Sequence, residues 1–164
     1  MVGHEAIRLI TTGDKISRAH VNKLMLHHLS FAVGDFARSR AFYDAALTPL
    51  GYVRVWTHEA GSGFKEVAAG YGIPGAEDVF AIRLRSEGLV APSDGFHLAF
   101  TARSKAAATA FHRAALEHGG RDNGGVGFHP EHGPNYFAAF VIDPDGHRIE
   151  AVVEEIIQPG AAPR

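Results

Sequence analysis

The sequence predicts an α+β fold in which two tandem β-α-β-β-β modules form a curled, cup-like, eight-stranded mixed sheet. The main observation is an internal repeat, because residues 28–47 can be laid over residues 97–116 without a gap and agree at nine of twenty positions. In addition, each copy combines a short strand-like run, a helix-like run and further strand-like runs. A duplicated supersecondary unit is the simplest interpretation.

Each copy is expected to begin with a strand and a capped helix. Asp35 and Ser104 are N-cap candidates that precede apolar residues at helical spacing. Gly51 and the pair 119–120 are expected to end the two helices. The strands that follow are predicted at 52–57, 64–72 and 79–84 in the first copy, and at 136–142 and 148–155 in the second.

The repeat also sets the expected domain boundaries. Residues 25–155 are predicted to form one domain, made of module one (25–85), a linker (86–95) and module two (96–155). Residues 1–24 are interpreted as an N-terminal extension or a cloning remnant, and 156–164 as a C-terminal tail.

Composition excludes several classes of function. The net charge is only −2 and the sequence has no long basic run, so neither nucleic acid nor an anionic membrane is an expected partner. The absence of Cys excludes disulfides and thiolate metal sites. No apolar run is long enough to span a membrane and no signal peptide is recognised, so we expect a cytoplasmic protein.

The stretch DPDGHRIEA at 143–151 places a carboxylate inside a strand that otherwise looks buried. Its turn residues between two apolar runs predict a β-hairpin. A buried carboxylate requires a cation, a metal ion or hydrogen-bond donors. For Glu150 the partner could be Arg148, Arg83 or a metal ion.

Strand alternation places His28, His97 and Glu150 on the less apolar sides of three different strands. Two imidazoles and one carboxylate leave coordination positions open for water and substrate, which is typical of a catalytic metal site. Iron, manganese, zinc, nickel and cobalt all suit such ligands. The copies are offset by 97 − 28 = 69 residues, so Glu150 corresponds to Ala81 and the first copy lacks the matching carboxylate. The alternatives are hydrogen-bonded rim histidines and a polar core cluster.

The segments 27–47 (HHLSFAVGDFARSRAFYDAAL) and 140–152 (FVIDPDGHRIEAV) resemble the opening and closing elements of the vicinal oxygen chelate superfamily, also called the glyoxalase/bleomycin resistance/dioxygenase superfamily. The resemblance covers residues 25–155 approximately. It implies paired modules around a divalent metal ion, a substrate chelated through two neighbouring oxygens, and a homodimer. It also implies metal ligands at the positions of His28, His97 and Glu150.

Departures from the family's pattern bear on the reaction. Relatives like glyoxalase I add a fourth ligand where this chain has Ala81, and bleomycin-binding members generally lack the ligands. We therefore expect a metal-dependent lyase or isomerase, or an extradiol-type dioxygenase, acting on a small molecule. The alternative is a bleomycin-resistance-like protein that sequesters a small molecule.

The Gly- and Pro-rich stretch 119–137 is expected to be a loop that closes over the site. Tyr136 and His132 are the candidate catalytic proton donors. Asn135 and, from module one, Arg83 are the candidate substrate-binding residues. Three further aromatic residues, Trp56, Phe64 and Phe80, are expected in the core.

Overall fold

The structure is a computed structural model that describes residues 26–85, 87–88, 91–92 and 95–153. The predictions for residues 1–24 and 156–164 lie outside the described residues. The elements of module one are β1 (Leu29–Val33), α2 (Phe36–Leu47), the 3-10 helix η1 (Thr48–Leu50), β2 (Val53–His58), β3 (Ala68–Gly72) and β4 (Phe80–Leu84). Those of module two are β5 (Leu98–Thr101), α3 (Lys105–Glu117), β6 (Arg121–Phe128), β7 (Phe137–Ile142) and β8 (Arg148–Val153).

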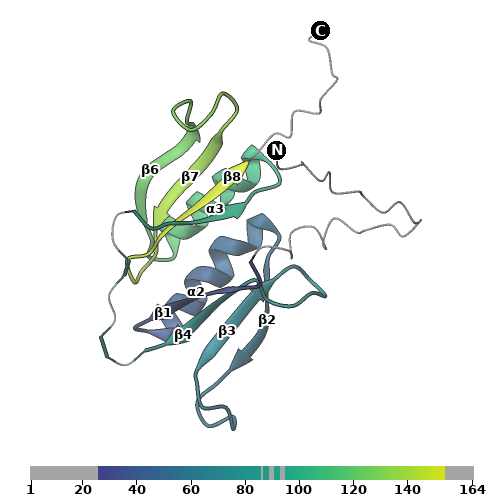
Figure 1. The fold of residues 1–164 in the computed structure, drawn as a ribbon, viewed down its shortest axis with the longest axis vertical. Coiled ribbons are helices and arrows are strands. Elements are labelled where there is room, and N and C mark those ends of the chain that lie inside the picture. Colours follow the sequence, from purple (N-terminus) through teal and green to yellow (C-terminus); the bar gives the residue numbers. More distant parts are fainter. Residues whose placement is uncertain (1–25, 86, 89–90, 93–94, 154–164) are drawn as a thin grey trace, which may run out of the picture.

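Each module contributes its own four-stranded mixed sheet (Figure 1). The strand orders are β1-β4-β3-β2 and β5-β8-β7-β6, and in both sheets the first pair is parallel while the others are antiparallel. Within the described residues no strand of one sheet pairs with a strand of the other. The predicted α+β fold of two β-α-β-β-β modules is confirmed. The described strands form two sheets that are not closed into one.

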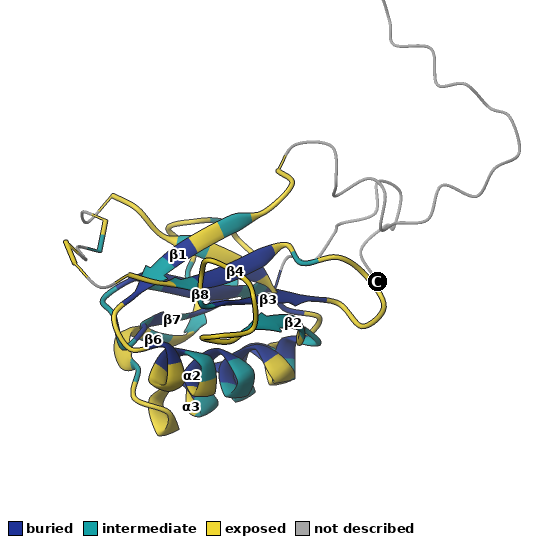
Figure 2. Ribbon diagram, turned by 90° about the horizontal axis from the view of Figure 1, so that it is seen from below, coloured by how far each residue is buried: buried dark blue, intermediate teal, exposed yellow. Residues whose placement is uncertain are grey.

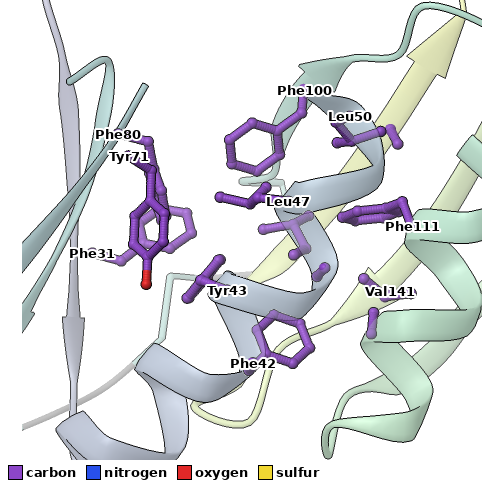
Figure 3. Close-up of a cluster of buried hydrophobic side chains, with 14 of the residues drawn as sticks. Phe31, Phe42, Tyr43, Leu47, Leu50, Tyr71, Phe80, Phe100, Phe111 and Val141 are labelled. Atoms are coloured by element: carbon purple, nitrogen blue, oxygen red, sulfur yellow. The ribbon is translucent and has the colours of Figure 1, made fainter. Parts of the chain in front are cut away.

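The two modules share one hydrophobic core. In Figure 3, α2 lies between the strand side chains of module one and helix α3. Tyr43 on α2 packs against Tyr71 and Phe80, with ring centroids 6.0 and 4.9 Å apart, and Phe42 on the same helix is fully buried. The contiguous cluster also includes Phe111 of α3. Burial of large aromatic side chains along this seam stabilises the contact between the modules.

Both helices lie on the same side of the sheets (Figure 2). Since alternate strand residues face opposite ways, the side chains at Phe31, Ile82 and Ile149 point into the core, and their neighbours point away from the helices. We call the side turned away from the helices the open face of each sheet. All three predicted metal ligands belong to the open faces by this alternation.

Local sequence signals set the ends of the elements. Asp35 and Ser104 cap α2 and α3, and each side chain accepts a hydrogen bond from the backbone N–H three residues on. Gly51 and Gly146 adopt positive φ values of 89° and 98°, after η1 and in the β7–β8 turn respectively. The predicted helix caps and hairpin are confirmed.

Two expectations are wrong. The stretch 119–137 is not a loop throughout, because β6 occupies Arg121–Phe128 and pairs antiparallel with β7. Its glycines carry little strand propensity, and the antiparallel pairing with the neighbouring strand β7 forms the strand in spite of them. Phe64 is 58% exposed rather than part of the core. Trp56 is only partly buried, whereas Phe80 is buried as expected.

No helix of the described residues has the length and apolar character needed to cross a membrane.

Candidate functional site

The strand pairing confirms the alignment of the two copies at the site. Leu29 pairs with Phe80 in module one, and Leu98 pairs with Ile149 in module two. Each residue of the first pair lies 69 positions before its counterpart in the second pair, since 29 + 69 = 98 and 80 + 69 = 149. Ala81, which pairs with Ser30, is therefore the structural counterpart of Glu150.

Glu150 lies in the middle of the second sheet. It pairs with Ala99 of β5 on one side and Phe140 of β7 on the other, and its side chain is only 4% exposed. Its Oε1 atom lies 3.3 Å from Nε2 of His97 and accepts a hydrogen bond of 3.5 Å from the hydroxyl of Tyr136. Both contacts are long for charge-assisted hydrogen bonds.

His97 lies at the solvent edge of this pair. Its side chain is 59% exposed, in contrast to the carboxylate that it contacts. An imidazole nitrogen and a carboxylate oxygen thus converge where a small cation can arrive from solvent. These are donor types that bind iron, manganese, nickel, cobalt or zinc. We call His97 and Glu150, two of the three predicted metal ligands, the ligand pair.

His28 is not assembled with the ligand pair. It immediately precedes β1 in the other sheet, and its Nδ1 atom lies 2.9 Å from Nδ1 of His27. Among the residues that the structure describes, no group of three or more His, Cys, Asp or Glu side chains is arranged to hold a metal ion. The structure thus brings together two of the three predicted ligands, and the role of His28 stays a prediction.

The segment between β6 and β7 folds onto the open face beside the ligand pair. The N–H of His129 donates to the Tyr136 carbonyl at 2.8 Å, which closes the segment. The His132 ring lies 5.3 Å from the ring of Tyr136, and the His129 ring packs edge-on against Phe140 at 4.7 Å. Both predicted proton donors are therefore close to Glu150, either directly or through one ring contact. Asn135 is exposed in the same segment.

Arg83 lies on the open face of module one. Its guanidinium forms an ion pair with Glu66, and its Nε donates a hydrogen bond of 3.4 Å to the Ser30 hydroxyl. Its predicted role in binding substrate therefore concerns a different sheet from the ligand pair.

An apolar cavity lies along the seam between the modules rather than over the ligand pair. Its volume is about 630 Å³, which is within the range of small-molecule sites. Its lining is mostly apolar and includes Leu29, Phe80 and Phe100. Ala99 also lines it, so the cavity reaches the strand residue that pairs with Glu150. Neither residue of the ligand pair lines it.

A buried polar cluster at the β7–β8 turn had no counterpart in the sequence prediction. Asp143 accepts hydrogen bonds from the hydroxyl of Tyr43 at 2.6 Å and from the backbone N–H of His147 at 2.8 Å, and it contacts Nδ1 of that histidine at 3.0 Å. Asp145 accepts from Ser39 at 2.5 Å and from Arg38 at 2.8 Å. We call these two carboxylates and their partners the turn network.

The turn network joins module two to helix α2 of module one. Burial raises the pKa of Asp143, but the hydrogen bonds from His147 and Tyr43 outweigh burial, so that the pKa is lowered. Burial and the neighbouring Asp143 carboxylate raise the pKa of Tyr43, which therefore stays a neutral donor. The sequence signal for this network was the presence of two carboxylates, Asp143 and Asp145, within one turn. That signal was not sufficient, because a turn does not require either carboxylate to be buried.

Comparison with known proteins places this fold in context. A family model described as the Glyoxalase/Bleomycin resistance protein/Dioxygenase superfamily matches residues 25–151. A search of curated proteins finds no match.

Several solved structures are similar. A glyoxalase/bleomycin resistance protein from Albidiferax ferrireducens T118 is 28% identical, with a TM-score of 0.64, over 80% of this chain and 99% of that chain. Glyoxalase I from Zea mays is 25% identical, with a TM-score of 0.57, over 77% of this chain and 44% of that chain. The present chain thus matches less than half of the maize enzyme. A glyoxalase-related enzyme from Fulvimarina pelagi, 18% identical with a TM-score of 0.59 over 80% of this chain and 88% of that chain, shares the fold.

Proposed function

The chain belongs to the glyoxalase/bleomycin resistance protein/dioxygenase superfamily, and on this premise we propose that it is a divalent-metal-dependent enzyme. The proposed reaction is that of a lyase or isomerase, or of an extradiol-type dioxygenase, on a small substrate that presents two neighbouring oxygens. The supporting observation is the ligand pair, in which Nε2 of His97 and Oε1 of Glu150 lie 3.3 Å apart. We further propose a cytoplasmic homodimer.

The environment of Glu150 fits a cation. A carboxylate that is almost fully buried is unfavourable unless positive charge or several donors compensate it. The two contacts to its Oε1, from His97 and Tyr136, are 3.3 and 3.5 Å long. Such long contacts leave the carboxylate able to bind a metal ion more closely. When bound, the cation would act as a Lewis acid toward the two substrate oxygens.

The neighbouring side chains supply proton transfer and positioning in this proposal. The hydroxyl of Tyr136 already reaches Glu150, so it can donate a proton to an oxygen of a substrate bound there. His132 lies beside the Tyr136 ring and can exchange that proton with solvent. Asn135 on the same segment, and Arg83 on the other sheet, are proposed to hold the substrate.

We propose that His28 completes the ligand set from the second subunit of the homodimer. In one chain His28 lies on the other sheet, while the imidazole of the ligand pair is exposed and open to an approaching subunit. A twofold dimer would then form two equivalent sites. Each would combine His28 of one protomer with His97 and Glu150 of its partner.

Subunit mixing tests this arrangement. His28→Ala and Glu150→Gln should each abolish metal binding. Unfolding and refolding the two variants together at equal amounts should restore about a quarter of the wild-type sites, because half of the dimers are mixed and each mixed dimer has one intact site. No restoration, with mixed dimers verified by native mass spectrometry, would show that the three ligands come from one chain.

The second candidate function is sequestration of a small molecule. The apolar cavity of about 630 Å³ supports it, because such a cavity can bind a ligand without metal. Elemental analysis of protein purified without chelators separates the two functions. A stoichiometric cation that is lost in Glu150→Gln supports the enzyme. A metal-free protein whose ligand binding is unchanged in His97→Ala supports sequestration.

A further inference from the structure

The open face of module one carries an aromatic side chain in an unusual position. The indole of Trp56 lies flat on the backbone of β3, because a methyl group at Gly70 would come within 2.2 Å of the indole Nε1 and 2.3 Å of Cε2. Only glycine permits this approach. One face of the indole is thus covered by the sheet, and the other face is turned toward the ring of His58.

The orientation of the indole is fixed. Its Nε1 donates a hydrogen bond of 2.9 Å to Asp78, at the end of the loop that precedes β4. Backbone below and a hydrogen bond at the edge together hold the ring in one plane. A ring held in this way is a fixed base for the rings that stack on it, so these lose little conformational entropy when a ligand binds.

Two more rings extend this surface. The imidazole of His58 lies 4.6 Å from the Trp56 ring at an angle of 32°, and the Phe64 ring stacks on it at 3.6 Å and 6°. Phe64 is nevertheless 58% exposed, so it leaves aromatic surface in contact with water. We call Trp56, His58 and Phe64 the aromatic platform.

The sheet beside the platform carries small side chains. Trp56 pairs with Gly70, which pairs with Ala81, which in turn pairs with Ser30. The counterpart of Glu150 is therefore part of a row of small residues that leads from the platform toward β1, although Ala81 itself is fully buried. No bulky side chain of this row separates the platform from the first strand.

Arg83 provides a positive charge at the border of this row. It follows Ala81 by two residues on the same face of β4. With strands ~4.8 Å apart and residues rising ~3.3 Å each, its Cα lies ~8 Å from the position beneath the indole. Its ion pair with Glu66 is exposed, with side chains 42% and 61% accessible, so an anion in solution can replace that partner at small cost.

We propose that the aromatic platform and Arg83 form a subsite for a planar aromatic group that carries a carboxylate. The ring stacks on the exposed Phe64, the outermost ring of the platform, and the carboxylate pairs with the guanidinium of Arg83 in place of Glu66. This inference rests on the proposed function, because it assigns the substrate class of the same enzyme: aromatic acids rather than aliphatic ones.

Trp56 is the single tryptophan of the chain, so its fluorescence reports on changes in the aromatic platform. The probe is benzoate, compared with cyclohexanecarboxylate, which lacks the aromatic ring, and benzamide, which lacks the charge. Affinities are measured on the full chain by fluorescence titration and calorimetry. Benzoate is expected to bind about tenfold more tightly than either control compound. Equal affinities for benzoate and cyclohexanecarboxylate would overturn the proposal.

Variants locate the binding. Phe64→Ala and Arg83→Gln should each weaken benzoate binding by about tenfold. The matched control is Phe128→Ala, because Phe128 is also 58% exposed but belongs to module two. An affinity that is unchanged in Phe64→Ala, or lowered equally in the control, contradicts the proposal.

The same variants separate this inference from the proposed function. Glu150→Gln should leave benzoate binding unchanged, since the subsite is on the other sheet, and Phe64→Ala should leave metal binding unchanged. If benzoate fails to bind while the cation binds, the subsite is wrong and the metal site stands. If benzoate binds as described and no cation binds, the metal site is wrong and the subsite stands.

Discussion

The hydroxyl of Tyr43 donates a 2.6 Å hydrogen bond to Asp143, across 100 residues of sequence and from one module to the other. Both side chains are buried, so neither can exchange this partner for water. Tyr43→Phe removes only the hydroxyl and leaves a buried carboxylate with one donor fewer. We expect the free energy of unfolding to fall by about 1–3 kcal/mol.

Urea denaturation measures this loss. The matched control is Tyr136→Phe, which removes a hydroxyl with a longer contact of 3.5 Å at a partly buried position and should cost less. Equal losses of unfolding free energy in the two variants would show that the hydrogen bond to Asp143 stabilises the protein no more than the longer contact of Tyr136.

The pH dependence of stability should reflect Asp143. Burial raises the pKa of Asp143, but the hydrogen bonds from His147 and Tyr43 lower it by more than burial raises it. The pKa in the folded state therefore lies below the pKa in the unfolded state. A carboxylate with a lowered pKa contributes stability above its unfolded pKa, about 3.9, and loses that contribution as the pH falls through the folded value. Stability should therefore drop below about pH 4.

Asp143→Asn isolates this contribution, because other carboxylates also titrate in the acid range. The difference in unfolding free energy between wild type and Asp143→Asn should be constant above about pH 5 and shrink toward pH 3. A difference that stays constant throughout would assign the acid sensitivity to other groups.

Ser39 tests the second half of the turn network. It is fully buried on α2 and donates to Asp145 at 2.5 Å. Ser39→Ala should lower stability by about 1–3 kcal/mol, because a buried acceptor loses its donor. Ser62→Ala serves as the control, since its hydroxyl bonds a backbone carbonyl at an exposed position and its loss should cost less than about 0.5 kcal/mol. Thermal unfolding compares the two.

The ligand pair predicts a specific loss of metal. His97→Ala and Glu150→Gln should each weaken cation binding by at least about 100-fold, since even residues that only support ligands account for 10–100-fold. His112 and Asp122 form another imidazole–carboxylate contact, at 2.7 Å, on helix α3 and strand β6. His112→Ala should leave the bound cation in place, as judged by elemental analysis and calorimetry. Loss of metal in His112→Ala alone would show that the cation binds at His112 and Asp122 instead.

Gly70 and Gly127 predict opposite responses to the same substitution. A methyl group at Gly70 collides with the Trp56 indole, whereas one at Gly127 meets no atom within 4 Å. Gly70→Ala should displace the indole, shift its fluorescence and lower stability by about 1–3 kcal/mol. Gly127→Ala should be neutral or slightly stabilising. An unshifted spectrum for Gly70→Ala would contradict the flat position of the ring.

The sequence was most informative where local patterns decide structure. The repeat, the caps at Asp35 and Ser104 and the hairpin around Gly146 depend on residues close together in the chain. Strand β6 was missed because its glycines give no local signal and its partner β7 supplies the pairing. The predicted eight strands require a strand at this point of the second copy, and the strand that follows the helix in the first copy could have located it.

The candidate site was predictable only in part for a similar reason. Alternation assigned His97 and Glu150 to the less apolar sides of their strands, and the structure brings them together because β5 and β8 are direct neighbours. The position of His28 depends on how the two sheets are placed relative to each other, which helix packing and the turn network decide. Neither the repeat nor the strand pattern encodes that placement.

The turn network also bears on how the chain melts. Two sheets whose described strands do not pair with each other could lose their structure one after the other, as separate domains do. Here one turn of the second half is bonded to the first helix, and one core crosses the seam. Each half therefore depends on its neighbour, and the protein is expected to unfold in a single cooperative transition. Substitution of both Asp143 and Asp145 is the change expected to let the two modules unfold in separate steps.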